Sequence, residues 1–161
     1  MKRIIFLSFL LLMVSCNSNA QKENNKQKID YKVNKTEDAW KAELSPEQYR
    51  VLREKGTERP HTGQYNLHFE NGSYACAGCN EQLFESDSKF DAHCGWPSFD
   101  KEIKRKVGYV KDKTLGMIRT EIICNNCGGH LGHVFNDGPT ETGQRYCVNS
   151  ASLSFDKKKD E

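Results

Sequence analysis

The sequence of 161 residues lacks a strong excess of charge of either sign. Its 24 Lys and Arg residues are nearly balanced by 22 Asp and Glu residues, which leaves a formal net charge of +2 at pH 7. Proteins that bind nucleic acid usually carry a basic patch or stripe, so this balance argues against a nucleic-acid partner. Long hydrophobic runs are also missing. The apolar run at residues 4–14 is shorter than the roughly 20 residues that a membrane-spanning helix needs.

That short run has the length of a signal-peptide core, and two basic residues precede it. Ser15 directly before Cys16 resembles the lipobox of bacterial lipoproteins, in which cleavage leaves the cysteine as a lipid-modified N-terminus. We therefore expect residues 1–16 to be a lipoprotein signal, with Cys16 as the lipidation site. The protein would be exported and anchored to a membrane of the cell envelope, facing the periplasm or the exterior. A plain secretory signal with an incidental cysteine is the alternative.

The residues after Cys16 predict three further regions. Residues 17–35 are polar and rich in amides, which is typical of a flexible tether because such a segment cannot bury enough apolar surface to offset its ordering. The length that follows suits one domain with a single core, at residues 36–156. Residues 157–161 are predicted to be a solvated tail.

Local signals favour a mainly β domain. Ser45, Pro46 and Gln48 form a capping box with proline at the first helical position, which predicts a helix from Pro46 to about Lys55, ended by Gly56. Beyond it, short β-rich runs recur between Gly, Asn and Asp residues. We expect an antiparallel β domain of six to nine short strands, with helices only near its N-terminus.

The seven cysteines fall into different groups. Cys76 and Cys79 form one CxxC pair, and Cys124 and Cys127 form another. Two such turns supply the tetrahedral thiolate set of a structural Zn²⁺ site, so we expect one zinc ion per chain that holds two hairpins together and takes no part in catalysis. A set of disulfides is the alternative, which export would permit.

Cys94 and Cys147 lie outside this metal pattern. Two buried thiols that act only as small hydrophobic residues are one interpretation. The sequence around Cys147 favours another: in a strand, Arg145, Cys147 and Asn149 would share one face and place a cation and an amide beside the thiol.

Two histidines follow the second CxxC pair. His130 and His133 are three residues apart, and binding of a metal next to them would fix their position. They are candidates for proton transfer, although a metal ligand or a surface histidine is an alternative. The other three histidines, at positions 61, 68 and 93, are expected to face solvent.

Together these motifs resemble the methionine-R-sulfoxide reductases of the B type. The resemblance runs from about Leu44 to Phe155 and rests on GTERPHTGQY, CAGC, CGWPSFD, CNNCGGHLGHVFNDGP and GQRYCVNSASL, in this order. It implies a fold of two antiparallel β-sheets with peripheral helices, and a zinc ion bound by the two CxxC pairs far from the active site.

The resemblance also implies a mechanism. Cys147 would attack the sulfur of methionine-R-sulfoxide in a protein or peptide and become a sulfenic acid. Cys94 would resolve that acid as a disulfide, which a thioredoxin-like protein would reduce. His93 stands where the family usually has a small residue before the resolving cysteine.

The family assigns further roles around the substrate. Trp96 and Phe135 would be the apolar wall against the substrate methyl group. His130, His133 and Asn149 would orient and protonate the oxide oxygen, and Arg145 would lower the pKa of Cys147.

Two other functions remain open at the level of sequence. One is a non-catalytic, zinc-stabilised binding module of related fold. The other is a thiol enzyme with a different substrate, such as a peroxide, in which the CxxC pairs are active dithiols. Nothing in the sequence suggests an obligate assembly, so we expect a monomer.

Overall fold

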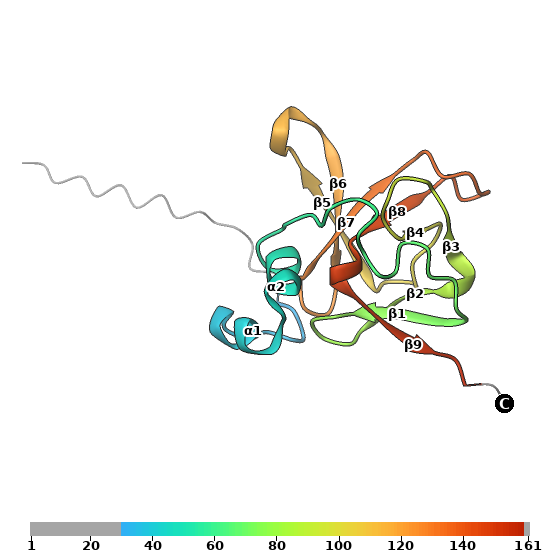
Figure 1. The fold of residues 1–161 in the computed structure, drawn as a ribbon. Coiled ribbons are helices and arrows are strands. Elements are labelled where there is room, and N and C mark those ends of the chain that lie inside the picture. The colour runs from blue at the N-terminus through green and yellow to red at the C-terminus, as the bar shows by residue number, and fades with distance from the viewer. Residues whose placement is uncertain (1–29, 160–161) are drawn as a thin grey trace, which may run out of the picture.

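The computed structural model describes residues 30–159, which form one folded body (Figure 1). The predicted signal, Cys16 and residues 17–29 of the predicted tether lie outside the described residues, as do residues 160–161. Between residues 30 and 159, no helix has the length and apolar character that crossing a membrane requires.

Two short helices precede the sheets: α1 spans Glu37–Glu43 and α2 spans Pro46–Leu52. The predicted capping box of α2 is confirmed, since the Ser45 hydroxyl accepts from the Gln48 N–H and the Gln48 side chain accepts from the Ser45 N–H. The predicted end at Lys55 is wrong. The helix stops at Leu52, and Lys55 takes a left-handed backbone conformation (φ 58°) that no helix continues through.

The strands form two antiparallel sheets, as predicted. One has three strands in the order β2-β1-β9, and the other has six in the order β3-β4-β8-β7-β6-β5. The described part of the chain also has three single turns of 3₁₀ helix: η1 (Ser86–Ser88), η2 (Thr114–Gly116) and η3 (Ser150–Ser152). The strands are β1 (Gly72–Cys76), β2 (Gln82–Glu85), β3 (Lys89–Phe90), β4 (Ser98–Phe99), β5 (Val107–Asp112), β6 (Arg119–Cys124), β7 (His130–Phe135), β8 (Arg145–Val148) and β9 (Leu153–Lys157).

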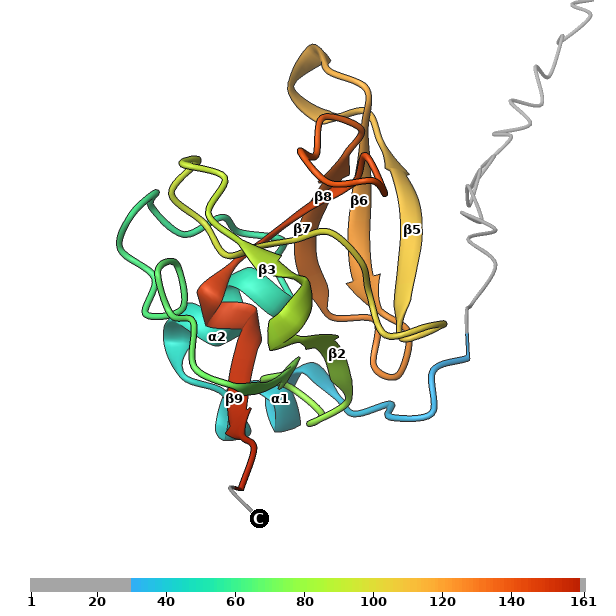
Figure 2. The same ribbon diagram turned by 90° about the vertical axis from the view of Figure 1, so that its right-hand side faces the viewer.

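The core is built from side chains of both sheets and both helices. Phe84 of β2 stacks on Phe99 of β4, with ring centroids 4.3 Å apart, and Tyr74 of β1 meets Phe99 edge to face. Trp40 of α1 and Leu52 of α2 are buried in the same cluster. Because α1 and α2 close this core, the predicted helices near the N-terminus have a packing role (Figure 2).

The edges of the predicted domain differ from the structure. The last residues of the predicted tether contact the body, since the Val33 N–H donates to the Asn126 carbonyl at 2.9 Å. At the other end, β9 continues to Lys157, and the Lys158 N–H donates to the Asn71 carbonyl. Both segments gain order from backbone hydrogen bonds that a composition argument does not detect.

One histidine expected to face solvent does not. His68 packs in an aromatic cluster, with its ring centroid 4.4 Å from that of Phe155, and its Nδ1 forms a hydrogen bond with the Tyr74 hydroxyl.

Candidate active site and cysteine cluster

The four CxxC cysteines converge on one point between the sheets. All four Sγ atoms lie within 4.8 Å of one another. The Cys76 and Cys127 sulfurs are 3.7 Å apart, and those of Cys79 and Cys124 are 3.6 Å apart. Four sulfurs bound tetrahedrally at the usual Zn–S distance lie about 3.8 Å from each other, so this set fits the ion closely.

Tight turns aim the sulfurs at that point. The Asn80 N–H donates to the Cys76 carbonyl and the Gly128 N–H donates to the Cys124 carbonyl, both at 2.8 Å. Gly128 takes a positive φ of 73°, which glycine adopts without strain. One CxxC pair begins at the end of β1 and the other at the end of β6. The cluster therefore joins the three-stranded sheet to the six-stranded sheet.

Cys94 and Cys147 form a second, separate pair of sulfurs. Cys147 lies in β8, and Cys94 lies in the loop before β4. Pairing of β4 with β8, in which Ser98 lies opposite Cys147, brings the loop over the strand. The two Sγ atoms are 3.9 Å apart and both cysteines are free. A disulfide needs about 2.05 Å, so only a small movement separates the two thiols from bond formation.

The two thiols have opposite shifts of pKa. The hydrogen bond from Cys147, with smaller contributions from Ser98 and from a backbone hydrogen bond at Trp96, lowers the pKa of Cys94 to about 5. The same hydrogen bond, together with burial, raises the pKa of Cys147. The contact between the two sulfurs thus couples their protonation, since deprotonation of one thiol disfavours deprotonation of the other.

Arg145 acts on the pKa of Cys147 in the predicted direction. Its positive charge does lower the pKa of Cys147, but the hydrogen bond with Cys94 and burial outweigh it. The guanidinium is also committed elsewhere: it forms two hydrogen bonds of 2.8 Å to the Asp137 carboxylate and lies over the Phe135 ring. Arg145 therefore holds Phe135 and the loop at Asp137 in place.

A cavity of about 130 Å³ opens beside the Cys147 thiol. Trp96 and Phe135 give it apolar walls, and His133 and Asn149 give it polar ones. The indole N–H of Trp96 donates to the Glu58 carbonyl at 3.2 Å, which fixes the ring. Its remaining lining comes from Thr57, Arg119, Gly132 and Val148.

A glycine lets the strands on either side of the cavity approach closely. A Cβ atom on Gly132 of β7 would lie 2.1 Å from the Cys147 carbonyl oxygen, a distance that no side chain can accommodate. The close approach places Cys147 opposite His133 in the β7–β8 pairing.

The two predicted proton-transfer histidines have different positions. His133 lines the cavity, and its Nε2 lies 2.9 Å from the Asp112 carboxylate. Burial lowers the pKa of His133, which favours its neutral form. His130 is buried and does not line the cavity; its Nδ1 lies 2.8 Å from the Glu121 carboxylate. In this arrangement the His130 side chain does not face the space that a substrate would occupy.

Asn149 is held rigidly at the cavity wall. Its side-chain oxygen accepts from the Glu58 N–H at 3.1 Å, and its amide nitrogen donates to the Leu131 carbonyl at 3.0 Å. The predicted row of three side chains on one strand is only partly formed, because β8 ends at Val148 and Asn149 begins the turn into η3.

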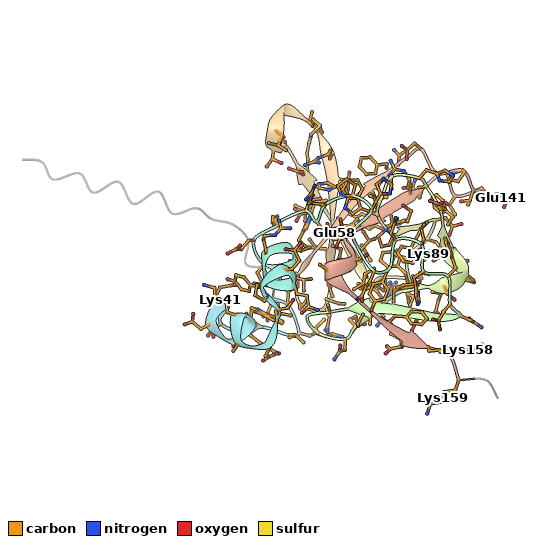
Figure 3. All side chains as sticks on the ribbon, in the orientation of Figure 1. Lys41, Glu58, Lys89, Glu141, Lys158 and Lys159 are labelled. Atoms are coloured by element: carbon orange, nitrogen blue, oxygen red, sulfur yellow. The ribbon has the colours of Figure 1, made fainter. Side chains whose placement is uncertain are left out.

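Three residues of the site escaped the sequence analysis. Glu58, labelled in Figure 3, is buried, and its carboxylate accepts from the N–H groups of Ser150 and Ala151. Arg119 lines the cavity; within the described residues its buried Nε–H has no hydrogen-bond partner. Asp112 joins it to His133. Glu58 lies in one of the quoted motifs, whereas Asp112 and Arg119 carry no local signal.

Comparison with known proteins decides the family. A family model described as the SelR domain matches residues 44–157. The protein named peptide methionine sulfoxide reductase MsrB of Leptospira interrogans is 55% identical over 131 residues, which are 81% of this chain and 100% of the relative. The chain belongs to the MsrB family.

Other relatives of the same name agree. The protein of Bradyrhizobium diazoefficiens is 56% identical over 130 residues, 80% of this chain and 94% of the relative. That of Agrobacterium fabrum is 58% identical over 126 residues, 78% of this chain and 93% of the relative. The predicted family and enzyme class are confirmed.

Proposed function

We propose that this chain reduces the R epimer of methionine sulfoxide in proteins and peptides to methionine. The observation that carries the proposal is the position of Cys147: the thiol opens into a cavity with apolar walls on one side and polar groups on the other, and a second thiol lies 3.9 Å away. Such a site holds both a nucleophile and the partner that completes a two-electron reduction.

The reaction proceeds in two steps on the protein. The Cys147 sulfur attacks the sulfoxide sulfur and the oxide oxygen takes up a proton. The S–O bond of the substrate breaks as the oxygen passes to the Cys147 sulfur, so methionine leaves and Cys147 becomes a sulfenic acid. Cys94 then attacks the Cys147 sulfur, which forms the disulfide and releases water. The low pKa of Cys94 supports the second step, because the thiolate is the form that attacks the sulfenic acid. A thioredoxin-like dithiol reduces the disulfide and is itself oxidised.

The walls of the cavity supply stereochemical selection. The sulfoxide sulfur carries a methyl group, an oxygen and the methionine chain. Trp96 and Phe135 accept the methyl group, while His133 and Arg119 face the oxygen. Since the methionine chain must leave through the opening, only one handedness satisfies all three directions at once. Asn149 keeps this wall in place, and His130 supports it from behind through Glu121.

A structural zinc ion completes the proposal. Cys76, Cys79, Cys124 and Cys127 would hold it, and the spacing of their sulfurs fits a closed four-sulfur site. None of these cysteines lines the cavity beside Cys147, so the ion would supply cohesion between the sheets rather than chemistry.

We also propose an exported monomer, tethered to a membrane of the envelope by a lipid on Cys16. The support is the N-terminal sequence alone: a short apolar run after two basic residues, then Ser15 and Cys16, then a polar segment. Lipid anchoring would direct the repair activity to oxidised proteins of the envelope. Its test is metabolic labelling with a fatty acid of the full-length chain and of a Cys16→Ala variant, and only the former should be labelled.

The activity test uses residues 30–161 with dithiothreitol and the two sulfoxide epimers of a methionine peptide supplied separately. We expect reduction of the R epimer alone, and its loss in Cys147→Ser. A Cys94→Ser variant should complete one turnover and then stop when thioredoxin is the only reductant. Reduction of neither epimer by folded protein would favour the non-catalytic binding module.

A further inference from the structure

We propose that the tip of the β5–β6 hairpin, residues 113–118, is the docking surface for the polypeptide that flanks the methionine sulfoxide. This inference rests on the proposed function, and it names the substrate class more closely: an extended segment with apolar side chains next to the oxidised methionine. The hairpin stands away from the body with its tip free in both views (Figures 1 and 2).

Three apolar side chains on this hairpin tip are exposed. Leu115 is 83% exposed, Ile118 is 76% exposed and Met117 is 46% exposed. Single exposed apolar residues are normal on a protein surface, but three within four consecutive positions form a patch. Such an exposed patch lowers the solubility of a protein, and it is typical of surfaces that become buried against a binding partner.

The backbone of the hairpin tip presents Leu115 outward. Leu115 has a φ of 56° and is followed by Gly116 with a φ of 71°. The left-handed region is unfavourable for a leucine. Turns usually have Gly or Asn at a position with this backbone conformation. The Thr114 N–H donates to the Asp112 carboxylate at 2.9 Å and holds the turn. A leucine in this conformation gains nothing from packing within the described residues, since it is almost fully exposed.

The hairpin tip is continuous with the catalytic cavity. Asp112 and Arg119 lie opposite each other at the end of the hairpin. Asp112 contacts His133, and Arg119 lines the cavity. Successive side chains of an extended strand alternate between faces, so Met117 lies on the same side as Arg119. By the same alternation Ile118 lies on the opposite face, in a second hollow that shares Arg119 and Phe135 with the catalytic cavity.

This continuity selects the occupant. A polypeptide whose methionine sulfoxide enters the cavity and that leaves it past Arg119 runs toward the hairpin tip. Its neighbouring apolar side chains then meet Met117 first, and Leu115 and Ile118 at the tip, within a few residues of the reacting sulfur. A second copy of this chain or a lipid surface would also bury the patch, but neither occupant accounts for its continuity with the site.

The test compares two substrates that differ only in what flanks the sulfoxide. One is a blocked single residue, N-acetylmethionine-R-sulfoxide amide, and the other is a nonapeptide with Leu and Val around the methionine-R-sulfoxide. The variant Leu115→Asn/Met117→Gln/Ile118→Thr removes the patch and keeps residues that suit the turn and the strand. Leu67→Gln is the matched control, because Leu67 is 65% exposed and lies outside both cavities.

We expect the triple variant to lose about tenfold in kcat/KM on the apolar peptide, mostly through KM, and to keep its rate on the blocked residue. Leu67→Gln should match the parent on both substrates. An unchanged rate on the peptide would overturn the proposal, and so would an equal loss on both substrates. Binding of the parent, but not of the variant, to neutral lipid vesicles or to a second copy with no effect on peptide kinetics would also overturn it. Failure of the parent on the blocked residue would instead overturn the proposed function.

Discussion

At the scale of single residues, the chemistry depends on how Cys94 and Cys147 share one proton. The hydrogen bond between them lowers the pKa of Cys94 to about 5 and, with burial, raises the pKa of Cys147. The two thiols are thus coupled, and the Cys147 thiol has to lose its proton before it attacks the substrate.

Alkylation kinetics test this division. As pH rises through about 5, Cys94 loses its proton, so its reaction with iodoacetamide should accelerate there in the parent. In a Cys147→Ala variant the midpoint should move upward toward the ordinary value, because the largest stabilising contact is gone. In a Cys94→Ala variant the midpoint for Cys147 should fall, because the hydrogen bond that raises its pKa is lost. Mass spectrometry of labelled peptides gives both profiles. A midpoint for each cysteine that stays at its parent value after the other cysteine is removed would contradict the coupling.

Glu58 is the residue that ties the site together. Its carboxylate accepts from the N–H groups of Ser150 and Ala151, its N–H donates to Asn149, and its carbonyl accepts from Trp96. An amide cannot accept in both carboxylate positions, so Glu58→Gln should lose about 1–3 kcal/mol of unfolding free energy. Urea denaturation measures this loss. A Gln64→Ala variant in the same loop, whose side chain makes none of these bonds, is the control.

The difference in unfolding free energy between the parent and Glu58→Gln should depend on pH in a definite direction. Burial raises the pKa of Glu58, so its protonated form stabilises the folded state below the unfolded pKa, and this contribution is lost as pH rises through the folded value. The stability gap between the parent and Glu58→Gln should therefore narrow as pH rises through that window. A gap that widens instead would mean that the backbone N–H groups outweigh burial.

At the scale of elements, short helices need their caps. Helix α2 has seven residues, too few to be stable by itself, and both reciprocal bonds of its capping box are present. Ser45→Ala should cost about 1 kcal/mol of unfolding free energy by removing the acceptor of the Gln48 N–H. Glu47→Ala is the matched control in the same helix. It removes only an exposed ion pair with Arg50 and should cost less than about 0.5 kcal/mol. Equal losses of unfolding free energy in the two variants would mean that the Ser45 cap stabilises the helix no more than the exposed ion pair does.

At the scale of the whole molecule, the cysteine cluster joins the two sheets. Structural zinc sites contribute about 10–16 kcal/mol of binding free energy, which is comparable to the whole stability of a domain. Removal of the metal with a strong chelator should therefore unfold the protein or lower its melting temperature by tens of degrees. Calorimetry with parallel metal analysis checks this expectation.

Matched variants separate the two groups of cysteines. Cys124→Ser should behave like the metal-free protein, because it removes one of the four ligands. A Cys94→Ser variant should melt close to the parent, since Cys94 lies outside the cluster. Protein that is purified without zinc or iron and melts at an unchanged temperature would contradict the metal site.

The sequence by itself determined whatever depends on local spacing. The CxxC pairs required two tight turns with converging sulfurs, the capping box required a helix start at Pro46, and alternating runs required antiparallel strands. Five motifs in order, of which the one around Cys147 is the last, carried the resemblance to the family that the comparison shows. These features are encoded within a few neighbouring residues, so they can be recognised without knowing the fold.

Only the tertiary structure decided which distant residues meet. It placed Cys94 against Cys147 through the β4–β8 pairing, moved His130 behind the cavity and His133 into it, and brought Asp112 and Arg119 from another hairpin. It also reversed the expected pKa of Cys147, because the balance between Arg145, burial and the Cys94 hydrogen bond depends on distances in space. Pairing across strands and the burial of charge are properties of the assembled sheets, and no local pattern carries them.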